Sequence, residues 1–264
     1  MAKTTSILSL AGAALALSVA GAAAADLPYK APMMAPPVQA FDWSGYYAGV
    51  GIGGSWGDSN WSNPFGPGAF GVSFDSAVAG LHGGAQYQFG GFGLGGGLVV
   101  GYEYSGSFAM DGFNGNTSCN GNPALNCQAK IESLYTIGGK LGLAWDRFML
   151  YGTGGWAGAN VATRAVTVPG GVIDDQTKQW QNGWYVGGGL DYAFYHTAGT
   201  DWIIGVDYKH IELDDTYHGV TNIPAAGNDR NVKVDADQLM GRLTVKFQGP
   251  LWPFASAAPV SARY

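Results

Sequence analysis

A two-residue alternation of apolar with small or polar residues recurs along most of this chain and limits the folds that it can adopt. Eight segments show the alternation, and they cover residues 46–56, 79–89, 92–104, 130–143, 148–161, 184–194, 202–209 and 238–247. Because successive side chains of a β-strand point to opposite faces, each segment is predicted to be a strand with one apolar face. A helix would place its apolar residues three and four positions apart. The sequence therefore predicts an all-β fold.

The third segment shows the pattern clearly. Leu98, Val100 and Tyr102 share one face, whereas Gly101 and Glu103 share the other. The other segments follow the same rule, with the exception of the fifth. There Leu150 and Trp156 compete with Met149 and Tyr151 for the apolar face. The register of the fifth strand is therefore left open.

The connections between the segments alternate in length. The long ones are expected near residues 57–74, 109–128, 163–182 and 214–232, and the others are short. Outer-membrane barrels have an even number of antiparallel strands, short periplasmic turns and longer extracellular loops. The alternation predicts this up-and-down arrangement and its orientation.

A water-soluble barrel has the same two-residue period, so the character of the two faces must decide. A soluble exterior is about 25–35% charged, but only 12% of all residues here are charged and 44 of the 264 are glycine. The apolar faces carry aromatic residues near the predicted strand ends, as membrane barrels do at both interfaces. These residues are Tyr46, Trp56, Trp145, Trp184, Phe194 and Trp202. We therefore predict an eight-stranded antiparallel transmembrane β-barrel over residues 43–247.

The N-terminal region is predicted to direct export. Lys3 precedes an apolar run over residues 7–19, and small residues follow, which is typical of a cleaved signal peptide at residues 1–25. The run is shorter than the roughly 20 residues that a membrane-spanning helix needs. Residues 26–42 contain four prolines and are predicted to form an extended periplasmic lead-in.

Nine charged side chains fall on the predicted inner faces, four acids and five bases. They are Glu103, Lys130, Glu132, Lys140, Asp191, Asp207, Lys209, Arg242 and Lys246. A charge inside a barrel needs a partner, and about eight strands leave room only for side chains. A plug of salt bridges is favoured over a narrow ion path.

Two cysteines lie in the second long connection. Cys119 and Cys127 are the only cysteines of the chain, and export exposes them to an oxidising compartment, which favours a disulfide. Closing so short a loop contributes roughly 2–3 kcal/mol. A metal site would need more ligands nearby than the sequence offers.

Patterns that indicate enzymes are weak in this sequence. Residues 49–54 satisfy the glycine pattern of dinucleotide-binding proteins, but no helical period follows, as that motif requires. The four histidines are scattered, and no spacing pairs a serine with His210 or His218 for catalysis on lipids. His82 is expected to face the interior. The net charge of −6 argues against nucleic-acid binding. We expect no enzyme activity.

Several motifs together resemble those of the alphaproteobacterial porin-family outer-membrane β-barrels, which include major surface antigens. The chain carries an Asp-Leu-Pro start at residues 26–28, Trp-Ser-Gly-Tyr-Tyr-Ala-Gly-Val from Trp43, Tyr-Gly-Thr-Gly-Gly-Trp-Ala from Tyr151, Gly-Trp-Tyr-Val-Gly-Gly-Gly-Leu-Asp-Tyr from Gly183, and Leu-Thr-Val-Lys-Phe ending at Phe247. The resemblance implies eight strands, location in the outer membrane of a Gram-negative bacterium, structural or surface roles, and haem binding in some members. It implies no catalytic residues.

The C-terminus departs from that family. Its chains normally end on the aromatic residue that marks the last strand for assembly, whereas residues 248–264 follow Phe247 here. The three prolines of this tail remove backbone donors, so the tail is predicted not to extend the last strand.

These features predict a structural and surface protein of the outer membrane with a plugged polar interior. The alternative is a narrow pore, or haem capture by an extracellular loop in which Tyr217 and His218 supply iron ligands; a solvated loop tip is the simpler interpretation of that pair. No cofactor is expected. The expected partners are outer-membrane lipid and lipopolysaccharide, the barrel-assembly machinery during biogenesis, and unidentified partners of the loops.

Overall fold

A computed structural model describes residues 41–62, 68–92, 96–114, 117–119, 122–197, 199–218 and 230–247. The predicted signal peptide, nearly all of the lead-in and the C-terminal tail lie outside these residues. The strands within the described part are β1 (Gly45–Ser62), β2 (Ala69–Phe92), β3 (Gly96–Ala109), β4 (Thr117–Cys119), β5 (Asn122–Trp145), β6 (Phe148–Thr167), β7 (Ile173–Thr197), β8 (Thr200–His218) and β9 (Arg230–Phe247). No helix among these residues is long and apolar enough to cross a bilayer.

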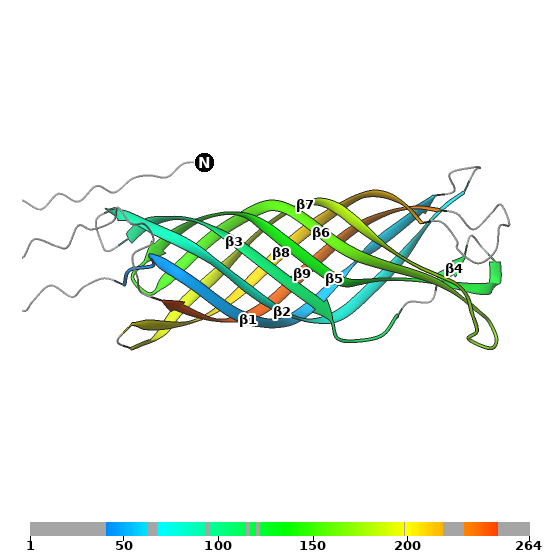
Figure 1. The fold of residues 1–264 in the computed structure, drawn as a ribbon, viewed down its shortest axis with the longest axis horizontal. Helices are drawn as coiled ribbons and strands as arrows, with labels where there is room; N and C mark the ends of the chain where they lie inside the picture. The colour runs from blue at the N-terminus through cyan, green and yellow to red at the C-terminus, as the bar shows by residue number, and fades with distance from the viewer. Residues whose placement is uncertain are drawn as a thin grey trace, which may run out of the picture. The chain divides into compact units, whose positions relative to one another are not determined.

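Eight long strands form a closed antiparallel ring (Figure 1). Neighbours in sequence pair with one another, β1 pairs with β9, and β3 pairs with β5. The short strand β4 pairs only with β5 among the described strands, beyond the end of β3. The predicted eight-stranded antiparallel barrel is confirmed, and β4 is an addition to it.

The strands are longer than predicted, because they continue through regions expected to be loops. β1 and β2 pair as far as Ser62 and Ala69, and β6 and β7 pair as far as Val166 and Ile173. The expected long connections at 57–74 and 163–182 are therefore wrong in extent. At the opposite end the turns are short, as predicted; Asp146 and Arg147 alone join β5 to β6.

The outward side chains form an apolar band next to the short turns. On β9 the band includes Leu239, Leu243 and Phe247, which expose 39–47% of their surface. Its span there, from 239 to 247, matches the 9–11 residues with which a tilted strand crosses a bilayer. We call this part of the barrel the membrane band.

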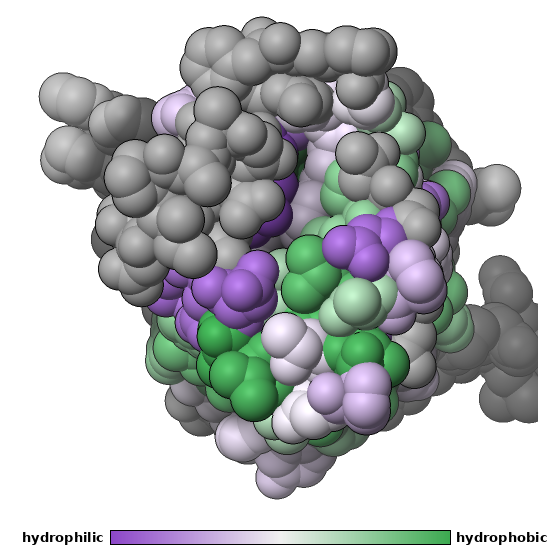
Figure 2. All heavy atoms as spheres, turned by 90° about the vertical axis from the view of Figure 1, so that its right-hand side faces the viewer, coloured by the Kyte–Doolittle hydropathy of each residue, from purple (hydrophilic) through white to green (hydrophobic). Residues whose placement is uncertain are grey.

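Beyond the membrane band the two faces exchange character. The strand segments 57–62, 69–77, 122–134, 157–167, 173–183, 210–218 and 230–238 make up what we call the projecting part. Their inner face is apolar, and its buried members include Trp61, Val72, Phe74, Ile211, Leu213, Val232 and Val234. Figure 2 looks onto this end of the barrel and shows hydrophobic residues between hydrophilic ones. This apolar interior explains the extra strand length, since buried backbone groups need partners.

Residues 41–44 close the short-turn end of the barrel. The Trp43 side chain is fully buried, and its Nε1 donates to the carbonyl oxygen of Asp146 at 2.9 Å. Its backbone N donates to Gln88 Oε1 at 2.8 Å, and Gln86 Nε2 donates to its carbonyl at 2.9 Å. We call this segment the periplasmic cap.

Candidate functional site

Six charged residues meet inside the membrane band and form what we call the central charge cluster. They are Glu103, Lys140, Asp191, Asp207, Lys209 and Arg242. Each comes from the inner face of its strand, and each side chain exposes 5% or less of its surface. Three acids therefore face three bases, and the formal charge of the cluster is zero.

Arg242 lies at the centre of this arrangement. Its two terminal nitrogens donate to the two oxygens of Glu103 at 3.1 and 2.8 Å. This fork matches a planar guanidinium to a planar carboxylate and is stronger than a single contact. Nη1 also donates to Asp207 Oδ2 at 3.3 Å and to the Tyr151 hydroxyl at 2.8 Å. Arg242 thus joins β9 to β3, β6 and β8.

The two lysines fill the remaining sides. Lys140 Nζ lies 3.5 Å from Asp191 and 3.9 Å from Glu103. Lys209 Nζ lies 3.3 Å from Asp207 and 3.7 Å from Glu103. Because every charge has an opposite charge nearby, the cost of removing these groups from water is offset.

Aromatic and histidine side chains surround the cluster. The Lys140 ammonium lies 4.0 Å from the ring centre of Tyr151 and 4.9 Å from that of Tyr47, which are cation–π distances. The Tyr47 hydroxyl donates to Glu103 at 3.2 Å. His82 also faces inward, and its Nε2 lies 2.8 Å from Thr244 Oγ1.

Small cavities lie beside and above the cluster. Two cavities have volumes of about 10 Å³ each; one is lined by His82, Lys209 and Arg242, and the other by Phe74 and Gln238. A single water needs about 10–15 Å³. Neither cavity offers a continuous water path.

Lys246 lies closer to the short turns and has a separate partner. Its Nζ is 2.9 Å from Asp201 Oδ2, and both side chains are buried. It also donates to the carbonyl oxygens of Asp42 and Ser44 in the periplasmic cap. Next to it on the same strand, Phe247 ends β9 opposite Tyr46 of β1 and faces outward.

Lys130 and Glu132 do not face the interior, which corrects the sequence prediction. The pairing of β5 with β6 shifts between Ile131 and Ser133, as at a β-bulge. The extra residue reverses the alternation beyond it, so Ile131 is buried inside instead. Glu132 pairs with the exposed Lys178 of β7, and Lys130 donates to the backbone oxygen of Asp111.

Tyr217 and His218 lie within β8 rather than at a loop tip. His218 is fully buried and Tyr217 is about half exposed, on the other face of the strand. Two side chains on opposite faces of a sheet cannot ligate one iron. Burial, and then the positive charge of Arg230, lower the pKa of His218 to about 4. His218 is held by Gln181 at 3.1 Å and Thr163 at 3.4 Å.

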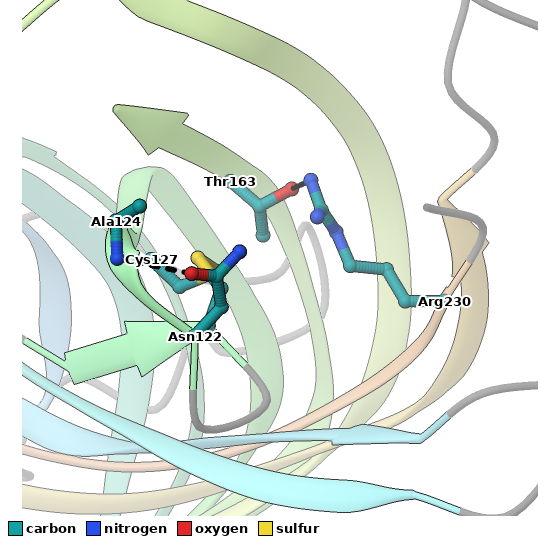
Figure 3. Close-up of a disulfide and its surroundings, with 6 residues drawn as sticks. Asn122, Ala124, Cys127, Thr163 and Arg230 are labelled. Atoms are coloured by element: carbon teal, nitrogen blue, oxygen red, sulfur yellow. Dashed lines mark hydrogen bonds between the residues drawn. A yellow bond between two sulfur atoms is a disulfide. The ribbon is translucent and has the colours of Figure 1, made fainter. Parts of the chain in front are cut away.

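The disulfide lies at the same end of the barrel. Cys119 of β4 is bonded to Cys127 of β5, and Cys127 belongs to the apolar interior of the projecting part. Figure 3 shows it with Thr163 and Arg230, which are joined by a hydrogen bond of 3.3 Å. The disulfide therefore attaches β4 to the rim of the barrel.

Some interior residues were missed by the sequence prediction. Asp201 is an even number of residues away from Asp207 and Lys209, so the alternation would have placed it on the same inner face. The predicted strand, however, began one residue later. The role of Trp43 had no such signal, since its partners lie far away in sequence. No group of three or more His, Cys, Asp or Glu in the described ranges is placed to hold a metal ion.

The fold and the interior define a small outer-membrane barrel, and sequence comparison agrees. Residues 11–247 match the outer membrane protein beta-barrel domain family, to which this chain belongs. The 31 kDa outer-membrane immunogenic protein of Brucella melitensis is 28% identical over 214 residues, which cover 75% of this chain and 83% of that protein. The chain is therefore a protein of the Gram-negative outer membrane.

Solved structures of similar fold are more distant. Neisserial surface protein A shares 18% identity, with 77% of this chain and 98% of that chain covered and a TM-score of 0.31. The attachment invasion locus protein of Yersinia pestis shares 12% identity, with 76% and 99% covered and a TM-score of 0.33. Neither supports a comparison residue by residue.

Proposed function

We propose that this chain is a non-enzymatic surface protein whose lumen is closed and whose role is structural, in envelope integrity and contacts at the cell surface. The central charge cluster carries the proposal. Its six charges neutralise one another and are anchored on strands β3, β5, β7, β8 and β9. A narrow pore would instead leave charges facing a water-filled path.

The histidines support the absence of catalysis. Within the described residues their side-chain partners are threonine, glutamine and aspartate, at His82, His196, His210 and His218. A serine nucleophile would need its base within hydrogen-bonding reach. The immunogenic relative from Brucella supports a surface role.

Conductance across a planar bilayer tests the closed lumen. The wild-type protein should give no stepwise currents. A folded triple variant, Glu103→Ala, Lys140→Ala and Arg242→Ala, should give them, because it removes the side chains that fill the centre. A Lys233→Ala variant, changed only on the outer face, should stay silent.

Steady unitary currents from the wild-type protein would overturn the proposal in favour of a pore. Folding of each variant is checked by its shift in gel mobility between boiled and unboiled samples. A haem titration that saturates at one site would point instead to ligand capture.

A further inference from the structure

Outward-facing aromatic rings form a continuous row where the membrane band meets the projecting part. Phe108, Tyr135, Trp180 and Trp156 follow one another with ring centres 5.9, 5.9 and 6.2 Å apart. The last three rings are nearly parallel, with 29° between neighbours, and they expose 37–42% of their surface. We call these three rings the aromatic surface; they come from β5, β6 and β7.

Glycines allow these rings to lie against the sheet. A methyl group at Gly158 would come within 2.4 Å of the Trp180 ring and 2.5 Å of the Trp156 ring. At Gly106 it would meet the Tyr135 ring at 3.3 Å. The rings are thereby held in fixed positions, with one side turned away from the protein. An aromatic face of this kind attracts the partly positive C–H groups of a sugar ring.

Basic side chains lie directly beyond the aromatic surface. Lys178 is the next outward residue after Trp180 on β7, and Arg164 and Lys130 lie at neighbouring positions on β6 and β5. Lys178 exposes 52% of its side chain and pairs with Glu132. Arg164 donates to Gln128 and packs on the Phe113 ring. Within the described ranges Arg164 forms no salt bridge, whereas Lys130 is held at Asp111 through the backbone oxygen of that residue.

The two sides of the projecting part differ in charge. The β5–β7 side carries Glu132 and Asp174 as well as its three bases, whereas the opposite side is strongly acidic. Seven acidic residues face outward from β1, β2, β8 and β9, with a single lysine, Lys233, among them. The acids are Asp58, Asp75, Glu212, Asp214, Asp215, Asp235 and Asp237. A negatively charged ligand is therefore directed to the β5–β7 side.

Below the aromatic surface the membrane band carries three outward glycines on β5 and β6. They are Gly139, which lies opposite Gly154, and Gly152, which lies opposite Leu141. A methyl group at Gly139 would meet nothing within 4 Å, and at Gly152 its nearest neighbour would be 3.8 Å away. Leu141 and Val186 stand on either side and are more than half exposed.

We propose that the outer face of β5, β6 and β7 is a binding site for a phosphorylated glycolipid of the outer leaflet. Acyl chains lie over the outward glycines of β5 and β6, sugar rings pack on the aromatic surface, and phosphates contact Lys178, Arg164 and Lys130. The order of these three zones along the strands matches the order of tails, sugars and phosphorylated core in lipopolysaccharide. The inference rests on the membrane location and is independent of whether the lumen conducts.

Binding of purified rough lipopolysaccharide to the folded protein in detergent tests the site. Arg164→Gln with Lys178→Gln should weaken binding by about tenfold or more, since each base near a charged membrane surface matters. Lys233→Gln is the matched control, because Lys233 is also a partly exposed lysine paired with a glutamate; its affinity should change less than about twofold. Lys178→Arg should retain binding.

The aromatic surface is tested by its own matched pair of variants. Trp180→Leu should weaken binding, whereas Trp56→Leu, at a similarly exposed tryptophan on the acidic side, should not. Equal losses in the two tryptophan variants, or in the Lys178 and Lys233 variants, would overturn the proposal. So would equal affinity for dephosphorylated lipopolysaccharide. Equal affinity for the lipid-free core oligosaccharide would exclude a membrane glycolipid as the ligand.

Discussion

Two stretches of one strand, β9, show opposite rules of burial. In the membrane band its outward residues include Leu243 and Phe247, and Arg242 is buried inside. In the projecting part Val234 is buried inside, and Lys233 is outside. The pairing with β8 continues through both stretches, apart from one shift near Leu213. The backbone pairing is therefore unaffected by the exchange of apolar and polar faces. Which face is apolar depends on the solvent that surrounds the strand.

The largest expected effect comes from breaking the polar interior. Arg242→Leu leaves Glu103 and Asp207 buried without their main partner, so the free energy of unfolding should fall by about 3–5 kcal/mol. Unfolding in urea, followed by tryptophan fluorescence in lipid vesicles, measures it. Lys233→Ala, which breaks an exposed pair with Glu212, should lower the free energy of unfolding far less, because water screens that pair. Similar losses in both variants would contradict a difference between the two regions.

The outer faces of the two regions can be compared by introducing arginine at one position of β9 in each region. Leu243→Arg places a charge in hydrocarbon and should lower the free energy of unfolding by about 2–4 kcal/mol. Asp235→Arg, on the same face of β9 but in the projecting part, should change it by less than about 0.5 kcal/mol. If both positions tolerate arginine equally, the boundary between the regions has been misplaced.

The disulfide should act on the projecting part alone. Reduction of Cys119–Cys127 should cost at most about 2–3 kcal/mol, because the closed loop is short. We expect faster protease cleavage near β4 and an unchanged mobility shift on heating. Thiol labelling of the denatured, unreduced protein checks the bond itself: labelling of both cysteines would exclude it.

The smallest effect concerns pH at the outer end. His218 has a pKa of about 4 in the fold and about 6.5 when unfolded. The unfolded chain therefore takes up a proton that the folded chain resists, and stability falls as the pH drops from about 6.5 towards 4. Between pH 7 and 5.5 the loss should be about 1 kcal/mol. His218→Gln should remove this difference in urea unfolding; an unchanged pH dependence would assign it to other groups.

The sequence was sufficient to predict the barrel because, apart from the fifth segment, each strand in the membrane band shows a single alternation. It was insufficient where that alternation changes. The outer ends of β1 and β6 were predicted as loops because apolar residues there move to the other face. Lys130 and Glu132 were misplaced because a bulge adds one residue without any mark in the local pattern.

Long-range contacts also could not be predicted from the sequence. Tyr47 and Tyr185 could be placed on an inner face from parity, but their contacts with Glu103 and Thr153 depend on how the ring closes. Tyr151 could not even be assigned a face, and the structure places it inside beside Arg242. The aromatic surface likewise depends on the pairing of β5, β6 and β7.

The periplasmic cap bears on the order of folding. Trp43 bonds to a turn 103 residues later, and Lys246 donates to Asp42 across 204 residues. Contacts between residues so distant in sequence carry a high entropic cost until the intervening chain is ordered. The cap can therefore form only after the first and last strands have met. Quenching of Trp43 fluorescence would then time the final step of barrel closure, later than the pairing of neighbouring strands.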